Sequence, residues 1–284
     1  MLTRISTVTF HGVEVLPVEV QCQLAGGLPA FTLVGLADKA VTESRERVRA
    51  ALSAIGLSLP PKRIIVNLAP ADRQKEGSHF DLPIAMALLC AIGVLPATLG
   101  ETYVALGELA LDGGLAPVGG ALAAAIAAHG QGKGLICPEA QGPEAAWSGA
   151  EILAPSSLLA LVNHFKGRQT LARPTPQIAE DIAQPLDFAD VKGQESAKRA
   201  LEICAAGNHN ILLVGPPGSG KSMLAARLPG IMPPLNPDEA LEASLIHSLG
   251  EGLPQGKLLR TRPFRAPHHS SSAVALVGGG SEFQ

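Results

Sequence analysis

The sequence predicts an α/β (α+β) protein of two domains, and three observations support this fold class. Apolar runs of strand length alternate with amphipathic segments of helix length along the 284 residues. Residues 168–186 interrupt this alternation with several prolines and few large apolar side chains, as linkers do. A glycine-rich loop then joins an apolar run to a helical segment. We therefore expect a first domain at 1–167, a linker at 168–186 and a second domain at 187–284.

The elements of the first domain follow from hydrophobic periodicity. Apolar residues alternate between Val8 and Val20 on both sides of a His11-Gly12 turn, which predicts a β-hairpin. Asp38 is a suitable N-cap for an amphipathic helix over residues 40–55. Apolar runs further along predict strands at 64–68, 103–106 and 135–137 and helices at 82–92, 121–129 and 156–165.

The second domain shows the same alternation in fewer elements. Its apolar run at 211–214 predicts a buried strand directly before the glycine-rich loop. Three further segments have helical spacing of their apolar residues, at 194–206, 221–228 and 237–249.

Composition excludes several classes of protein. Apolar residues make up 46% of the chain, which is enough for a core and excludes wholesale disorder. A net charge of −3 excludes a globally basic nucleic-acid binder, although a local basic patch is compatible with it. The four cysteines are far apart and predict buried reduced thiols rather than zinc ligands or disulfides. Because neither a signal peptide nor a membrane-spanning apolar stretch is visible, we expect a cytoplasmic protein without a membrane partner.

The strongest motif is the phosphate-binding loop, a Walker A sequence. It reads Gly215, Pro216, Pro217, Gly218, Ser219, Gly220, Lys221 and Ser222, which matches G-x-x-x-x-G-K-[ST]. Its glycines let backbone N–H groups turn toward phosphate oxygens, and the following helix adds its positive N-terminal end. We expect Lys221 to reach the β- and γ-phosphates of ATP and Ser222 to hold Mg²⁺.

A cluster of cations follows near the end of the chain. Lys257, Arg260, Arg262 and Arg265 lie within nine residues that contain no acid. One interpretation is that these cations contact DNA phosphates, in the pore of a ring if several subunits assemble. The other is an ordinary solvated flank of a strand, and the sequence leaves both interpretations open.

Short motifs along both domains occur in the order typical of one family. In the first domain these are Gly27-Leu28-Pro29, Val34-Gly35-Leu36, Asn67-Leu68-Ala69-Pro70-Ala71-Asp72, Lys75-Glu76-Gly77, Asp81-Leu82-Pro83-Ile84-Ala85 and Gly107-Glu108-Leu109. In the second they are Asp190-Val191-Lys192-Gly193-Gln194, Ala206-Gly207-Asn208-His209-Asn210, the phosphate-binding loop and Arg262-Pro263-Phe264-Arg265-Ala266-Pro267-His268-His269-Ser270. The chain resembles the YifB/ComM family, relatives of the ATPase subunit I of magnesium chelatase.

This resemblance implies a fold and an activity. It implies a first domain with the Lon-protease-like (ribosomal protein S5 domain 2-like) fold, followed by part of a P-loop AAA+ α/β domain. Val191 and Gly193 would lie near the adenine, and the cofactors would be ATP and Mg²⁺. By analogy, the intact protein would be a homo-hexameric, helicase-like motor that promotes DNA branch migration in natural transformation, or competence, and in recombination.

The resemblance also bears on proteolysis, because Lon-type proteases use a Ser–Lys dyad. Alignment of the motifs places the nucleophile position on His79 and the lysine position on Leu122. Neither side chain can fill its role, so we expect a domain that is not a protease. A shifted pair built from Ser78 and Lys75 remains the alternative.

A second acidic motif is missing from the sequence after Ser222. P-loop ATPases place an Asp-Glu pair at the end of a second apolar strand, and the nearest apolar run, residues 273–277, leads into glycines instead. We therefore expect a C-terminally truncated AAA+ module that binds ATP with little turnover alone.

Two other functions are compatible with the sequence. The phosphate-binding loop would equally serve the ATPase subunit of a magnesium chelatase-like metal-insertion complex, although the appended first domain favours the DNA motor. The third possibility is a non-enzymatic scaffold, in which the first domain only assembles rings or contacts regulatory partners.

Overall fold

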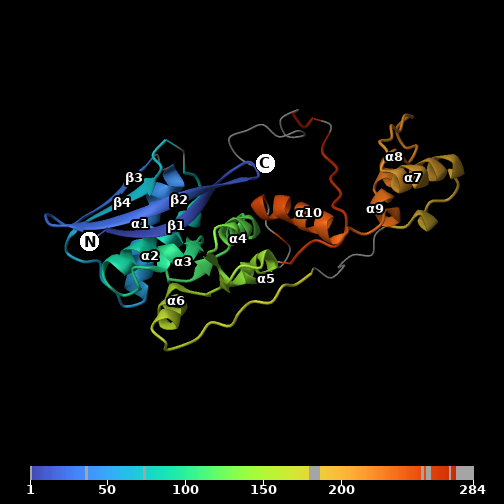
Figure 1. Ribbon diagram of the computed structural model, residues 1–284. Coiled ribbons are helices and arrows are strands. Elements are labelled where there is room, and N and C mark those ends of the chain that lie inside the picture. The colour runs from blue at the N-terminus through green and yellow to red at the C-terminus, as the bar shows by residue number, and fades with distance from the viewer. Residues whose placement is uncertain are drawn as a thin grey trace. The chain divides into compact units, whose positions relative to one another are not determined.

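The computed structural model describes residues 2–35, 38–72, 75–178, 186–250, 253, 257–268 and 270–272. The chain divides into two compact units (Figure 1). The first consists of residues 1–177 and 245–257, and the second of residues 178–244 and 258–282. The first boundary lies at 177/178 rather than at the predicted 167/168, and a later segment of the chain joins the first unit.

A mixed sheet forms the centre of the first unit, so the predicted mixed α/β class is confirmed. Among the described residues the strand order is β3-β4-β2-β1-β5-β8-β9. These strands are β1 (Leu2–His11), β2 (Glu14–Ala25), β3 (Ala30–Val34), β4 (Arg63–Ala69), β5 (Tyr103–Ala105), β8 (Gly134–Ile136) and β9 (Ile152–Leu153). A separate short pair consists of β6 (Glu108–Leu109) and β7 (Leu115–Ala116). The short strands β3, β6, β7 and β9 were not predicted.

The predicted hairpin is β1 and β2, which pair in antiparallel register from Leu2 opposite Gln23 to His11 opposite Glu14. The turn is therefore Gly12-Val13, one residue later than predicted, and Gly12 has a φ of 60° that favours glycine. β4 pairs antiparallel with β2 and parallel with β3, so it has a neighbour on each side.

Two helices build the main core against these strands. In α1 (Lys39–Ala54), the Asp38 carboxylate accepts the Val41 N–H at 2.7 Å, which confirms the predicted N-cap. α2 (Asp81–Ala91) is buried along most of its length and packs on β1 and β2, with α1 beside it. A helix that is buried on all sides is apolar on all sides and has little amphipathic periodicity. The sequence predicted this helix from its apolar content for that reason.

A second core lies under α4 (Ala121–Gly130), whose alanines pack against Val8, Val104 and Leu135. The alanines allow close approach of the helix to the strands because their side chains are small. The remaining helices of this unit are α3 (Leu99–Thr102), α5 (Gly142–Ala145) and α6 (Leu158–Phe165).

The predicted linker is extended, and two residues of its first part contact the first unit. The Leu171 N–H donates to His164 Nδ1 at 3.2 Å, and the Leu171 side chain joins the main core. The Trp147 indole N–H donates to the Gln177 carbonyl at 3.0 Å. Most residues from 168 to 177 are exposed, as expected of an extended segment, but Leu171 and Gln177 make contacts with the first unit that were not expected. Residues 179–185 lie outside the described part of the chain.

The second unit contains helices α7 (Glu195–Gly207), α8 (Lys221–Ala225), α9 (Leu228–Ile231) and the first part of α10 (Pro237–Leu249). α10 has the predicted bounds, whereas the helix predicted at 221–228 is shorter and is followed by a separate turn. α10 begins with a reciprocal capping box, since the Glu239 N–H donates to Asn236 Oδ1 and the Asn236 N–H to Glu239 Oε2.

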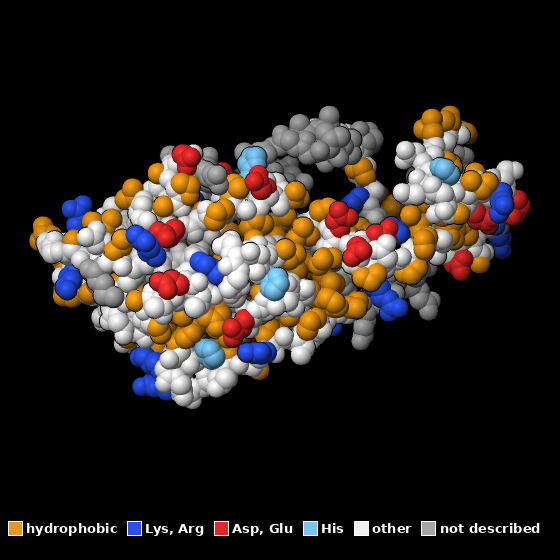
Figure 2. All heavy atoms as spheres, viewed as in Figure 1, with side chains coloured by type: hydrophobic (Ala, Val, Ile, Leu, Met, Phe, Trp, Pro, Cys, Tyr) orange, Lys and Arg blue, Asp and Glu red, His pale blue; other side chains and the backbone are white. Residues whose placement is uncertain are grey.

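The predicted strand at 211–214 is wrong. These residues belong to no strand, and the side chains of Leu212 and Val214 are 85% and 86% exposed. A strand exists only where a neighbour completes its hydrogen bonds, and none of the described residues pairs with this run. Exposed hydrophobic side chains are visible over the part that carries α7 and α8 (Figure 2).

Candidate functional site

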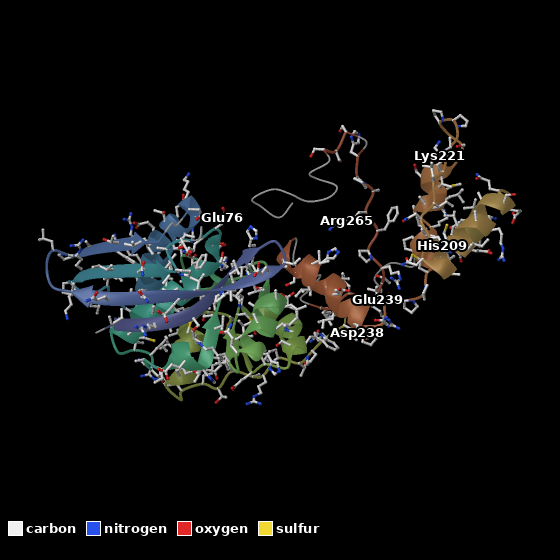
Figure 3. All side chains as sticks on the ribbon, turned by 45° about the horizontal axis from the view of Figure 1, so that its top comes forward. Glu76, His209, Lys221, Asp238, Glu239 and Arg265 are labelled. Carbon is white, nitrogen blue, oxygen red and sulfur yellow. The ribbon has the colours of Figure 1, made fainter. Side chains whose placement is uncertain are left out.

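The phosphate-binding loop lies between the unpaired run at 211–214 and the start of α8 (Figure 3). Gly218 and Gly220 have φ values of 81° and 84°, in the left-handed region that glycine adopts without strain. The glycines at these two motif positions are therefore required by the backbone. Gly220 is the residue directly before α8, so the chain turns there and enters the helix at Lys221.

The Lys221 ammonium group lies over this loop. Its Nζ donates to the carbonyls of Gly215 and Pro216, both at 2.8 Å, and to Ser219 Oγ at 3.3 Å. All three acceptors are neutral oxygens at the surface. Anionic oxygens form stronger hydrogen bonds with an ammonium group than neutral oxygens do. The loop thus holds a cation for which phosphate oxygens are the better partners.

The segment predicted to lie near the adenine is brought to this loop. Val191 is buried in a small core with Leu201 of α7 and Leu224 of α8. The Gln194 side-chain amide donates to the Ser219 carbonyl at 3.3 Å, which ties the segment to the loop. Gly193 is exposed and has a φ of 71°. The role of Gln194 was missed, because its sequence neighbours give no sign of a contact with residue 219.

Arg227 provides a second connection within this unit. Its Nε donates to the Asp187 carbonyl at 2.8 Å, and its guanidinium lies 3.6 Å from the Asp190 carboxylate. The segment that contains Asp187 and Asp190 is thereby fixed to the chain that follows α8. The loop, the 187–194 segment and α7 form one local assembly around Lys221.

The four cations predicted to contact DNA have different surroundings. Arg262 is engaged in the protein, because its guanidinium pairs with Glu239 at 2.9 Å and donates to the Pro233 carbonyl at 2.9 Å. Arg260 and Arg265 are exposed, and Lys257 is half-buried. The guanidinium of Arg262 fixes the chain to the start of α10, which is a structural role that the sequence pattern did not reveal.

His79, one position of the degenerate dyad, and Gly120, directly before α4, both lie close to the Phe10 ring. Its centroid is 5.6 Å from that of His79, and a Cβ added at Gly120 would lie 2.3 Å from its Cζ. His79 Nε2 is 3.0 Å from the Val8 carbonyl, so this nitrogen carries the hydrogen. Burial lowers the pKa of His79 to about 4, which keeps the ring neutral. Leu122 is fully buried.

The alternative pair, Ser78 and Lys75, has other partners. Ser78 Oγ donates to the Glu108 carboxylate, and the Lys75 ammonium donates to the Pro70 carbonyl. A serine that donates to a carboxylate lacks the lysine base that a Ser–Lys dyad uses. The hydrogen bonds at both residues therefore favour structural roles over peptide hydrolysis.

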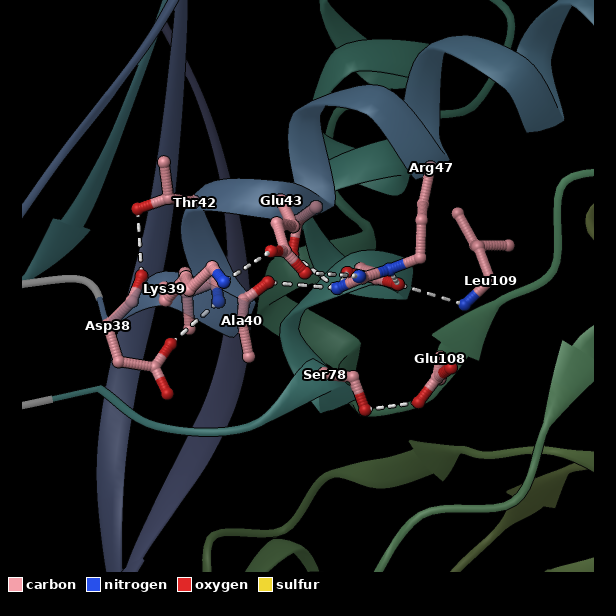
Figure 4. Close-up of polar contacts among 12 residues, drawn as sticks. Asp38, Lys39, Ala40, Thr42, Glu43, Arg47, Ser78, Glu108 and Leu109 are labelled. Atoms are coloured by element: carbon pink, nitrogen blue, oxygen red, sulfur yellow. Dashed lines mark hydrogen bonds and ion pairs between the residues drawn. The ribbon is translucent and has the colours of Figure 1, made fainter.

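A buried ion pair that the sequence did not predict joins three elements (Figure 4). Asp81 is fully buried and accepts Nε of Arg47 at 2.5 Å and Nη2 at 3.0 Å. The same carboxylate accepts the Leu109 N–H at 3.1 Å, so α1, α2 and β6 meet there. The hydrogen bond to Asp81 raises the pKa of Arg47, which stays a cation.

No group of three or more His, Cys, Asp and Glu side chains that could hold a metal ion occurs in the described part of the chain. All four cysteines, Cys22, Cys90, Cys137 and Cys204, are free and buried, as the sequence predicted. Within the same described residues, no helix is both long and apolar enough to cross a membrane.

Two family models match the chain. Residues 187–284 match the family described as magnesium chelatase, subunit ChlI, and residues 18–141 match the family described as subunit ChlI of Mg-chelatase. Together they cover more than half of the chain, including the phosphate-binding loop and both positions of the degenerate dyad.

Curated proteins match nearly the whole length of the chain. It is 46% identical over 274 residues to the uncharacterized protein YifB of Salmonella typhimurium and 44% identical over 281 residues to that of Escherichia coli. It is 43% identical over 276 residues to the competence protein ComM of Haemophilus influenzae. The chain belongs to the YifB/ComM family. The matches cover 95%, 99% and 95% of this chain but 54%, 56% and 54% of the relatives, so it spans a little over half their length.

Proposed function

We propose that the chain is the nucleotide-binding part of an AAA+ motor of the YifB/ComM type. The observation that carries this proposal is the arrangement of the Walker A loop, where Lys221 donates only to neutral oxygens in the bonds described above. ATP would be held by the loop residues 215–222, with Val191 and Gly193 beside its adenine. Ser222 would contribute its hydroxyl to Mg²⁺, which neutralises phosphate charge when bound.

DNA is the partner that we propose for this motor in its full-length form. The support is the competence protein ComM among its relatives and the exposed cations Arg260 and Arg265. The activity would be branch migration by a hexamer in the cytoplasm. The sequence after Ser222 contains no acidic pair at the end of an apolar run. Because P-loop ATPases hydrolyse ATP with the help of such a pair, the chain alone would bind ATP with little turnover. The hydrogen bonds of His79 and Ser78 support a first unit without protease activity.

Nucleotide binding is tested directly with a fluorescent ATP analogue and Mg²⁺. Lys221→Ala is expected to weaken binding by about tenfold or more, since one charge-assisted phosphate contact contributes at least about 1.4 kcal/mol. Lys166→Ala, which removes an exposed lysine in the first unit, is the matched control and should bind like the wild type. Equal affinity of both variants and the wild type would contradict the proposal.

The partner is tested in a protein extended to the full length of the relatives. Branch migration of a four-way DNA junction should require ATP and stop in Lys221→Ala. The second candidate is a metal-insertion motor, which the matched magnesium chelatase family favours. ATP hydrolysis that responds to a porphyrin and a partner subunit, but not to DNA, would select that candidate instead.

A further inference from the structure

The last turn of α10 lies against the start of α4 inside the first unit. Residues 245–257 belong to this unit, although α10 begins at Pro237 in the second. The Gly120 N–H donates to the Ser248 carbonyl at 2.6 Å, and the Leu122 N–H donates to Ser248 Oγ at 3.4 Å. Amides in the first turn of a helix have no partner within the helix. Ser248 therefore supplies two acceptors that α4 lacks.

A buried carboxyl group holds the other side of Ser248. Its Oγ donates to Glu144 Oε1 at 3.3 Å, and Glu144 is 1% exposed. The Gln141 amide donates to the same oxygen at 3.3 Å, while its own carbonyl accepts the Val118 N–H at 3.0 Å. A buried carboxyl is costly unless hydrogen bonds satisfy it. One of the two donors to Glu144 thus comes from a residue 104 positions away in the sequence.

The shape of the α4 start also fits this turn. A Cβ added at Gly119 would lie 3.0 Å from the Leu249 carbonyl oxygen and 3.6 Å from that of Ser248. Gly119 does not have a left-handed φ, so its backbone does not itself require glycine. The close approach of the α10 turn leaves little room for a side chain there. Steric fit and hydrogen bonding thus select the same segment.

We propose that the start of α4, with Glu144 and Gly119, is a docking site that acts as a latch for the last turn of α10. The site includes Leu122, the residue that the family resemblance assigns to the lysine position of a protease dyad. The Leu122 N–H and the Glu144 carboxyl group bind the Ser248 hydroxyl at the end of α10. The part of α10 that the latch holds, residues 245–249, belongs to the first unit. None of the groups named above belongs to the phosphate-binding loop, so hydrogen exchange tests the latch separately from nucleotide binding.

Hydrogen exchange of backbone amides tests the latch in the full chain. Gly119→Val places a side chain against the Leu249 carbonyl, and Gly130→Val is the control at the other end of α4. A Cβ at Gly130 meets nothing within 4 Å. Exchange at residues 120–122 and 245–249 is expected to become about tenfold faster in Gly119→Val only, because these amides would open locally. Exchange in β1 and β2 reports whether the first unit remains folded.

A second pair of variants tests the latch without steric strain. Ser248→Ala removes the hydroxyl that joins Leu122 to Glu144. Ser244→Ala is the matched control, since Ser244 lies one turn earlier, is fully buried and accepts the Leu259 N–H at 2.9 Å within the second unit. Faster exchange at Leu122 in Ser248→Ala but not in Ser244→Ala supports docking. Unchanged exchange in both Gly119→Val and Ser248→Ala, relative to their controls, would overturn it.

Discussion

Two apolar runs, one in each unit, have similar composition, but only one of them forms a strand. Residues 64–68 form most of β4, which pairs with β2 and β3 and buries the side chains of Ile64, Val66 and Leu68. Residues 211–214 are as apolar, yet they have no strand neighbour among the described residues and expose Leu212 and Val214. Local pattern alone would assign both runs to buried strands.

The difference shows what local sequence does and does not determine. Side-chain preference makes both runs suitable for a sheet, but the sheet itself depends on partners that are distant in sequence. β4 has partners on both sides, and its burial contributes stability. The side chains at 211–214 have the same preference for a sheet, but Leu212 and Val214 are not buried. We therefore expect equivalent substitutions to have unequal effects in the two units.

The largest expected difference is between two leucines. Leu68→Ala removes a fully buried side chain and should lower the free energy of unfolding by about 2–5 kcal/mol, as cavity-creating substitutions do. Leu212→Ala removes an 85% exposed side chain and should change it by no more than about 0.5 kcal/mol. Scanning calorimetry of both variants measures these effects. A loss for Leu212→Ala as large as that for Leu68→Ala would show that the run at 211–214 is buried in solution.

The next comparison concerns two glutamates with opposite pKa shifts. Burial raises the pKa of Glu144 to about 7, although hydrogen bonds from Ser248 and Gln141 partly offset this effect. Hydrogen bonds from the Asn236 N–H and from Arg262 lower the pKa of Glu239. Cys137 is the titratable group that interacts electrostatically with Glu144, and burial raises the pKa of its thiol, which stays neutral.

The sign of the pH dependence follows from these shifts. The Glu144 pKa in the folded state exceeds the ordinary value of 4.5, so its contribution to stability is complete below about pH 4.5 and is lost as the pH rises through about 7. The loss is at most about 3 kcal/mol by linkage. For Glu239, whose pKa is lowered, the contribution is present above its ordinary pKa and is lost as the pH falls.

Trp147, the single tryptophan, lies in the first unit and reports its unfolding. Denaturant titrations followed by its fluorescence at pH 5 and pH 8 measure the dependence on Glu144. Glu144→Gln should remove most of the difference between the two pH values, and Glu239→Gln should leave it in place. A difference that persists in Glu144→Gln would assign the titration to another group.

Sequence predicted best the features that local chemistry determines. The Asp38 cap, the bounds of α10 and the glycines of the phosphate-binding loop all depend on residues within a few positions of one another. Contacts between distant residues were not predicted, such as Arg47 with Asp81 and Glu144 with Ser248. The side-chain type at each of these positions is compatible with many partners, and only the folded chain selects one. The contacts that Leu171 and Gln177 make with the first unit were missed for the same reason.

The smallest expected effects separate two ion pairs. Arg47 and Asp81 pair with 20% and 0% of their side chains exposed, whereas Arg262 and Glu239 pair with 24% and 40% exposed. Asp81→Asn removes the negative charge that neutralises Arg47 and should lower the free energy of unfolding by about 2 kcal/mol. This is less than the loss expected for a fully buried ion pair, because water reaches part of the Arg47 side chain. Glu239→Gln keeps the capping geometry and removes a solvent-screened charge, so its effect should be smaller and should vanish at high salt. Urea titrations at low and high salt measure both variants. Equal destabilisation by Glu239→Gln and Asp81→Asn at every salt concentration would mean that water screens neither ion pair more than the other. The contrast between buried residues of the first unit and exposed residues of the second would then not extend to charged groups.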